Sequence, residues 1–204
     1  MKQIMRAKDM FLRKTNLIQI FFIVFIYTGS SYANNELNNS VITYMQELKD
    51  CSFSFLQSTD EEISEGSISI GLNRIRIDYQ KPSRIIIILD ETKGMYYNVD
   101  LDEDEFFNPK NTTASFFFEM FKNPDFLRNS NYSIKNKNII IKNNGVINDQ
   151  NYKLEIYFEN KPVVLRKIKF ELSDILTTLS VFNYKKNENF NKNFFKLINP
   201  TFFN

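Results

Sequence analysis

From residue 52 onward, apolar and polar residues alternate with a period of two, and this pattern constrains the fold more than any other feature of the chain. In the segment 52–57 two phenylalanines alternate with serines. In the segment 74–80, Ile75, Ile77 and Tyr79 alternate with Arg, Asp and Gln. Successive side chains of a strand point to opposite faces, so each segment predicts a strand with one apolar face. The gaps between strands are a few residues long, which favours an antiparallel meander.

The same reasoning predicts a long antiparallel sheet of about ten strands, which should curl because each strand twists against its neighbour. Strands are expected at 52–57, 67–71, 74–80, 84–89, 94–99, 132–135, 138–142, 152–158, 163–172, 177–183 and 194–198. Pro82 should end the third of these strands, because proline has no backbone donor. The run Arg84–Leu89 is apolar without alternation, so we expect a strand covered on both faces. Turns are expected at Asn144-Gly145 and at 160–162.

Two segments show helical spacing instead. Asn34 to Asp50 predicts an amphipathic helix, since its apolar residues recur at spacings of three and four. Thr112 to Phe121, followed by a second short element at Pro124–Leu127, predicts a short helix rich in phenylalanine. Two interpretations of the Phe-rich helix are open: it fills a core, or it is a lid over a cavity on the apolar face of the sheet.

Composition excludes several classes of function. The chain has 204 residues, no histidine and one cysteine, so imidazole chemistry, an internal disulfide and a CxxC site are impossible. No GxSxG or SxxK motif is present, and we expect neither an enzyme nor a cofactor. The net charge is +2, but the first sixteen residues carry +4, which leaves −2 for the rest. This nearly neutral body argues against nucleic acid as a partner.

An acidic run at 100–105 could suggest a calcium site. An EF-hand loop that starts at Asp100 needs Gly at its sixth position and Glu at its twelfth, but the chain has Glu105 and Asn111 there. A solvated edge or turn is the better interpretation, because charges protect a sheet edge from pairing with other chains.

The N-terminus has the pattern of an export signal. A basic segment precedes the apolar run Leu17–Thr28, which is shorter than the roughly 20 residues that a spanning helix needs. Small residues at Ser31 and Ala33 predict cleavage after Ala33. We therefore expect residues 1–33 to be a signal peptide and residues 34–204 to be a single exported domain located in the periplasm. An uncleaved membrane anchor is the alternative.

Several short blocks resemble, in order and spacing, the outer-membrane lipoprotein carrier protein (LolA) family. Segment 54–57 is similar to the S-F-x-Q strand of that family, 65–70 to its E-G strand, and 76–82 to its R-φ-E-Y-x-x-P strand, where φ is apolar. The resemblance also includes the blocks at 86–90, 95–98, 111–113 and 195–200. It implies a mainly β (α+β) fold: an incomplete, strongly curved antiparallel β-barrel of about ten to eleven strands, with an N-terminal helix and a short Phe-rich helical lid.

The function that the resemblance implies is a periplasmic chaperone that carries the acyl chains of lipoproteins from the inner to the outer membrane. It implies three partners: acylated lipoproteins, an inner-membrane lipoprotein-releasing ABC transporter and an outer-membrane lipoprotein receptor. We expect a monomer and no metal. An acyl-chain cavity is expected to be lined by Phe55, Ile68, Ile70, Ile75, Ile77, Tyr79, Ile86 and Ile88. The expected lid residues are Phe116, Phe117, Phe118 and Phe121.

The chain departs from the family where the lid is held closed. The family often has Arg-Pro at the start of the R-φ-E-Y strand, and Gly71-Leu72 stands there in this chain. Arg74 and Arg76 alternate with isoleucines and should face outward. Two alternatives to a carrier are a lipid-sensing regulatory domain of the same fold, which binds a protein partner, and a sandwich whose core is filled.

Overall fold

The computed structural model describes residues 29–60, 62–147 and 149–203, so most of the expected signal peptide lies outside the described residues. The chain divides into two compact units, Met1–Asn39 and Ser40–Asn204. Helix α2 (Gly29–Gln46) begins in the first unit and ends in the second. Within the described residues, no helix is both long and apolar enough to cross a bilayer.

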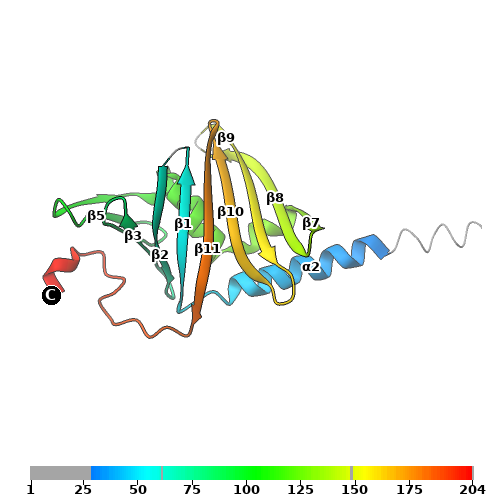
Figure 1. The fold of residues 1–204 in the computed structure, drawn as a ribbon, viewed down its shortest axis with the longest axis horizontal. Coiled ribbons are helices and arrows are strands. Elements are labelled where there is room, and N and C mark those ends of the chain that lie inside the picture. Colours follow the sequence, from blue (N-terminus) through cyan, green and yellow to red (C-terminus); the bar gives the residue numbers. More distant parts are fainter. Residues whose placement is uncertain (1–28, 61, 148, 204) are drawn as a thin grey trace, which may run out of the picture. The chain divides into compact units, whose positions relative to one another are not determined.

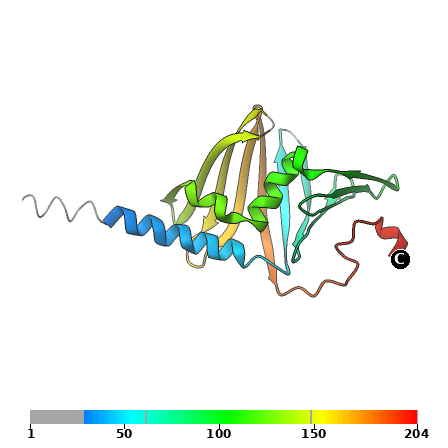
Figure 2. The same cartoon turned by 180° about the vertical axis from the view of Figure 1, so that it is seen from behind.

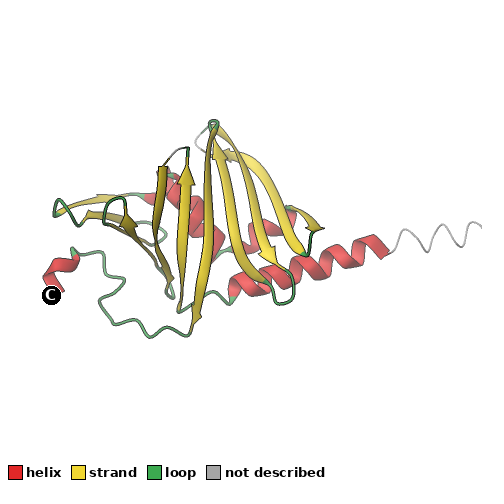
Figure 3. Ribbon diagram, in the orientation of Figure 1, coloured by secondary structure: helices red, strands yellow, loops and turns green. Residues whose placement is uncertain are grey.

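The second unit contains one sheet of eleven strands, in the order β6-β5-β4-β3-β2-β1-β11-β10-β9-β8-β7 (Figures 1 and 3). Every neighbouring pair is antiparallel. The strands are β1 (Cys51–Thr59), β2 (Glu62–Ile70), β3 (Ile75–Lys81), β4 (Ile85–Leu89), β5 (Gly94–Asn98), β6 (Glu103–Phe107), β7 (Asn131–Lys135), β8 (Asn138–Ile147), β9 (Gln150–Glu159), β10 (Val164–Leu172) and β11 (Ile175–Lys186). The sheet is curved and does not close, because β6 and β7 remain as free edges. This architecture confirms the expected incomplete barrel.

Tight turns between consecutive strands produce the meander. Ser173 and Asp174 join β10 to β11 with φ angles of 50° and 66°, and Asn136 and Lys137 join β7 to β8 with 52° and 65°. Two consecutive positive φ angles define the turn whose twist matches that of the flanking strands. Asn and Asp tolerate this conformation better than most residues, because their short polar side chains bond to the local backbone.

Short helices link the two halves of the sheet. After β6 come η1 (Pro109–Asn111), α3 (Thr113–Lys122) and η2 (Pro124–Asn129). The Thr112 hydroxyl accepts a hydrogen bond from the Ala114 amide at 3.2 Å and so caps α3. Figure 2 shows that α3 and η2 lie across one face of the sheet.

The same face is filled over β8, β9 and part of β10. Ile141, Ile156 and Ile168 are almost completely buried there. Tyr44 in the last turns of α2 packs edge-on against Phe158 at 5.9 Å, and its hydroxyl accepts from the Leu165 amide at 3.1 Å. This part of the face therefore belongs to a conventional hydrophobic core.

The acidic run lies at a solvated edge, as expected, because Glu103–Glu105 are exposed and belong to β6 at the edge of the sheet. Strand β6 itself was not expected, and two other details of the expected secondary structure were wrong. Asn144 and Gly145 lie inside β8 rather than in a turn. The segment 194–198 is not a strand, although its residues alternate. It belongs to an irregular C-terminal segment, residues 187–203, that ends in η3 (Pro200–Phe203) (Figure 3).

Candidate functional site: a cavity beneath helix α3

The rest of the covered face is hollow. A cavity of about 380 Å³ lies between α3 and residues of β1–β4, β6, β10 and β11, within the size range of small-molecule sites. None of the described residues that line it carries a charge. The lining consists of Phe55, Gln57, Ile68, Ile75, Ile77, Tyr79, Ile87, Leu89, Phe107, Thr113, Ala114, Phe117, Phe121, Phe170, Leu172, Ile175, Thr177 and Leu179.

Strand register explains why these side chains converge. Ile77 of β3 lies directly opposite Ile68 of β2 and Ile87 of β4. Directly opposed residues point to the same face of an antiparallel pair. One row of isoleucines therefore crosses three strands and forms part of the cavity wall.

Five of the eight expected cavity residues line this space: Phe55, Ile68, Ile75, Ile77 and Tyr79. That they bind acyl chains remains a prediction. Ile70 is completely buried, but it lies at the end of β2 and outside the cavity lining.

The assignment of Ile86 and Ile88 to the cavity was wrong. Ile86 and Ile88 pack on the opposite face of β4 with Met95 and Tyr97 of β5 and with Leu197 of the C-terminal segment. Ile87 and Leu89 line the cavity in their place. The run Arg84–Leu89 contains no polar residue after its first position. Its sequence therefore does not indicate whether the odd-numbered or the even-numbered residues face the cavity. The pairing with β3 decides this, while the expectation that both faces of the strand are covered is confirmed.

The four expected lid residues do not share one orientation. Phe117 and Phe121 line the cavity. Phe116 packs instead against the rings of Phe126, Tyr152 and Phe170, with centroids 5.1 to 5.7 Å away. Phe118 is buried but does not line the cavity. Helix α3 thus covers the cavity with one side and fills a core with another, so each of the two interpretations of this helix describes one of its sides.

Strands β6, β10 and β11 also line the cavity, and none of their residues was among the expected cavity residues. Phe107 reaches the cavity from the edge strand because Gly94 lies opposite it. A Cβ atom on residue 94 would lie 2.4 Å from the Phe107 ring. Phe170 and Leu172 alternate along an expected strand, and this alternation was a usable signal, but only the sheet order places β10 beside β11 and beneath α3.

Lys122 fastens the end of α3 to the turn between β2 and β3. Its ammonium group donates to the carbonyl oxygen of Gly71 and, at 3.2 Å, to that of Leu72. Burial lowers the pKa of Lys122 from 10.5 to about 8, against the opposing effect of Cys51 and Asp50. These carbonyl groups belong to the two residues that stand where the family that the chain resembles often has Arg-Pro. In this chain a side chain of α3, that of Lys122, therefore connects the helix to the turn.

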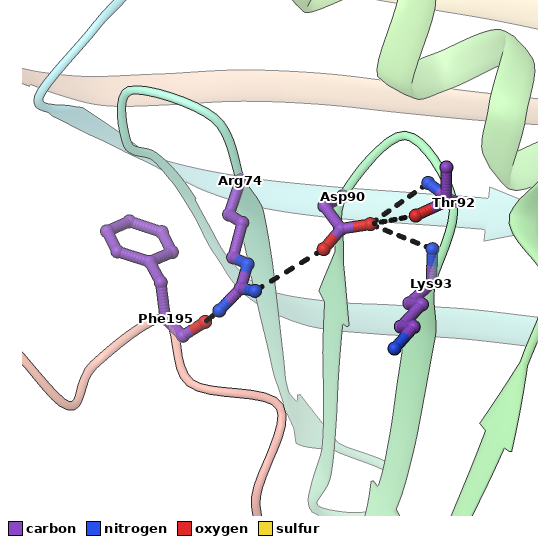
Figure 4. Close-up of polar contacts among 5 residues, drawn as sticks. All are labelled: Arg74, Asp90, Thr92, Lys93 and Phe195. Carbon is purple, nitrogen blue, oxygen red and sulfur yellow. Dashed lines mark hydrogen bonds and ion pairs between the residues drawn. The ribbon is translucent and has the colours of Figure 1, made fainter.

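Arg74 and Arg76 bind the C-terminal segment. Arg74 donates to the Phe195 carbonyl oxygen at 2.7 Å and pairs with Asp90 at 3.4 Å (Figure 4). Arg76 pairs with Asp78 at 2.7 Å, donates to the Phe194 carbonyl oxygen at 2.9 Å and lies 4.3 Å from the centre of the Phe194 ring. Both arginines therefore face away from the cavity, as expected from their alternation with isoleucine.

Asp90 is itself held in place by the turn that follows β4. Its carboxylate accepts from the Thr92 amide at 2.9 Å and from the Lys93 amide at 2.8 Å (Figure 4). Burial acts to raise the pKa of Asp90, but these hydrogen bonds and the charge of Arg74 outweigh it and lower the pKa. The carboxylate is thus ionised and available to orient Arg74.

An open, curved sheet that holds an apolar cavity beneath a short helix defines a carrier-type protein for lipids or lipoproteins. Residues 46–198 match the family described as outer membrane lipoprotein carrier protein LolA, and the chain therefore belongs to the LolA family. Members of this family are carriers rather than enzymes. No curated protein matches the chain in sequence.

Solved structures resemble the chain at low sequence identity. An uncharacterized conserved protein from Thermus thermophilus is similar with a TM-score of 0.50 and 11% identity, over 74% of this chain and 89% of that one. This likeness concerns the fold alone. LprF from Mycobacterium bovis is similar with a TM-score of 0.39 and 6% identity, over 78% of this chain and 96% of that one.

Proposed function

We propose that this protein is a periplasmic carrier that shelters the acyl chains of lipoproteins in the cavity beneath α3 and moves them from the inner to the outer membrane. The observation that carries the proposal is the uncharged, unfilled cavity of about 380 Å³ in a member of the LolA family. A void of this size gives an acyl chain an apolar environment that water does not offer, at about 0.8 kcal/mol per buried CH₂ group.

The nature of the lining supports a carrier with broad cargo range. Isoleucine, leucine and phenylalanine side chains make up most of it, and apolar contact is non-directional. Many lipoproteins with the same lipid anchor could therefore use one cavity. Helix α3 covers one side of the cavity, so a movement of this helix would widen the entrance for cargo, and such a movement would break the Lys122 contacts.

We further propose that residues 1–33 are a signal peptide cleaved after Ala33, and that residues 34–204 form the exported carrier domain. The basic segment and short apolar run support export. In this scheme the partners are an inner-membrane lipoprotein-releasing ABC transporter as donor and an outer-membrane lipoprotein receptor as acceptor, and the carrier works as a monomer.

Mass spectrometry of the protein purified from its own periplasm tests the proposal. We expect a bound triacylated polypeptide to copurify with the wild-type chain and to be lost from Ile77→Glu, which places a carboxylate in the cavity wall. Ile63→Glu is the matched control, since Ile63 is 68% exposed and lies outside the cavity. Recovery of a protein partner without acylated peptide would support the regulatory-domain alternative. Equal recovery of lipoprotein with both variants would contradict the cavity assignment.

A further inference from the structure

Besides Thr113 of α3, the polar residues of the cavity lining lie on the sheet and gather at one end. Gln57, Tyr79 and Thr177 belong to its lining. Gln57 and Tyr79 lie near the ends of β1 and β3, and Thr177 lies near the start of β11. In an antiparallel sheet these three positions share one end. The opposite end is lined by Ile68, Ile75, Leu89 and Phe121, so the cavity is amphipathic along its length.

A glycine on β2 leaves room for the polar groups to meet. Gly66 lies opposite both Phe55 and Tyr79, and a Cβ atom there would lie 2.9 Å from the Phe55 ring. The Phe55 and Tyr79 rings therefore meet across this strand at 5.2 Å. The Tyr79 hydroxyl then donates to the side-chain oxygen of Gln57 at 3.0 Å, two strands away.

This hydrogen bond orients the Gln57 amide. Burial raises the pKa of Tyr79, so its hydroxyl stays protonated and acts as the donor. The Gln57 oxygen is thereby occupied, while the amide nitrogen makes no hydrogen bond to any residue that the structure describes. Two N–H donors are thus left without a protein partner at the wall of a largely apolar cavity, where an acceptor on a bound ligand can meet them.

We propose that the Gln57 amide is a subsite for the ester carbonyl of a neutral acyl glyceride, with the hydrocarbon chain extending toward Leu89 and Phe121. This inference rests on the proposed function and names the chemical class of ligand for the same cavity. An ester carbonyl is an acceptor without a donor, which matches a free N–H group. A carboxylate or phosphate would need a cation, and no described residue of the lining is Lys or Arg.

The donor geometry also determines the order of groups in the bound ligand. The ester lies at the end where β10 and β11 are joined by Ser173 and Asp174, and where Ile175 is 51% exposed. The part of the ligand beyond the glycerol can therefore reach solvent there, while the chain fills the apolar end.

Fluorescence displacement with three labelled probes of equal chain length tests this inference: a monoacylglycerol, a free fatty acid and an alkane. We expect the wild type at neutral pH to bind the monoacylglycerol at least about tenfold more tightly than the fatty acid. Gln57→Leu should weaken monoacylglycerol binding about fivefold, the usual worth of one neutral hydrogen bond, without weakening alkane binding. Tyr79→Phe should act in the same direction because it releases the amide.

The matched control is Ser58→Leu, which makes the same kind of change on the exposed face of β1 and should alter neither affinity. Thermal unfolding monitored by circular dichroism confirms that each variant is folded. Unchanged monoacylglycerol affinity in folded Gln57→Leu, with the alkane still bound, would overturn the ester subsite and leave the carrier proposal standing. If the wild type binds neither the monoacylglycerol nor the alkane, the proposed function itself fails.

Discussion

Neighbouring residues of β4 offer a direct test of whether the cavity is hollow. Ile88 is 1% exposed and packs in a filled cluster with Met95 and Tyr97, whereas Ile87 is half-buried and lines the cavity. Ile88→Ala removes three buried carbons at about 0.8 kcal/mol each and leaves a new void, so we expect a loss of about 3 kcal/mol in the free energy of unfolding. Ile87→Ala removes the same carbons from a wall that already borders empty space, and we expect a loss of about 1 kcal/mol.

Urea unfolding followed by circular dichroism measures both losses, and the two variants differ in sequence only by which residue of the strand is shortened. The binding of a fluorescent acyl-ester probe is expected to change in the reverse order, with a larger effect for Ile87→Ala. Equal losses of stability would mean that the space beneath α3 is packed as tightly as the cluster on the other face. That result would refute the hollow cavity and the carrier mechanism with it.

Three further perturbations address the lid and the C-terminal segment. Phe117→Asp should loosen α3, and we expect amide hydrogen exchange in that helix to become at least about tenfold faster. Unchanged exchange would show that Phe117 does not hold α3 over the cavity. Since the pKa of Lys122 falls from 10.5 to about 8 on folding, the folded chain releases this proton first, and the contribution of Lys122 to stability rises from pH 8 toward pH 10.5. The stability of Lys122→Met should not show that rise. If the wild type and Lys122→Met changed in stability by the same amount between pH 8 and 9, the lowered pKa of Lys122 would be contradicted. Arg76→Ala should cost about 2 kcal/mol and speed proteolysis of the C-terminal segment near Phe194. Arg84→Ala is the control, because the ion pair of Arg84 with Asp100 is exposed, and we expect it to lower the free energy of unfolding by less than about 1 kcal/mol.

Local patterns were sufficient for most of the fold. Alternation identified β3, and Pro82 marked its end, because strand side chains and backbone donors obey local rules. The same alternation placed Ile75 and Ile77 on one face and Arg76 on the other. Thr112 indicated the start of α3, because a hydroxyl at that position caps the first amides of a helix.

Contacts between distant segments decided the remainder. Ile86 and Ile87 are chemically identical, so only pairing with β3 determines which of them faces the cavity. Local alternation at 194–198 predicted a strand, but no described strand offers that segment a partner, and its backbone is bound instead by Arg74 and Arg76. The sequence by itself determined most of the strands and that one face of the sheet is apolar. Whether that face is filled or hollow, and where Gln57 leaves its donors, depended on the tertiary structure, because a void results from side chains that are far apart in the chain.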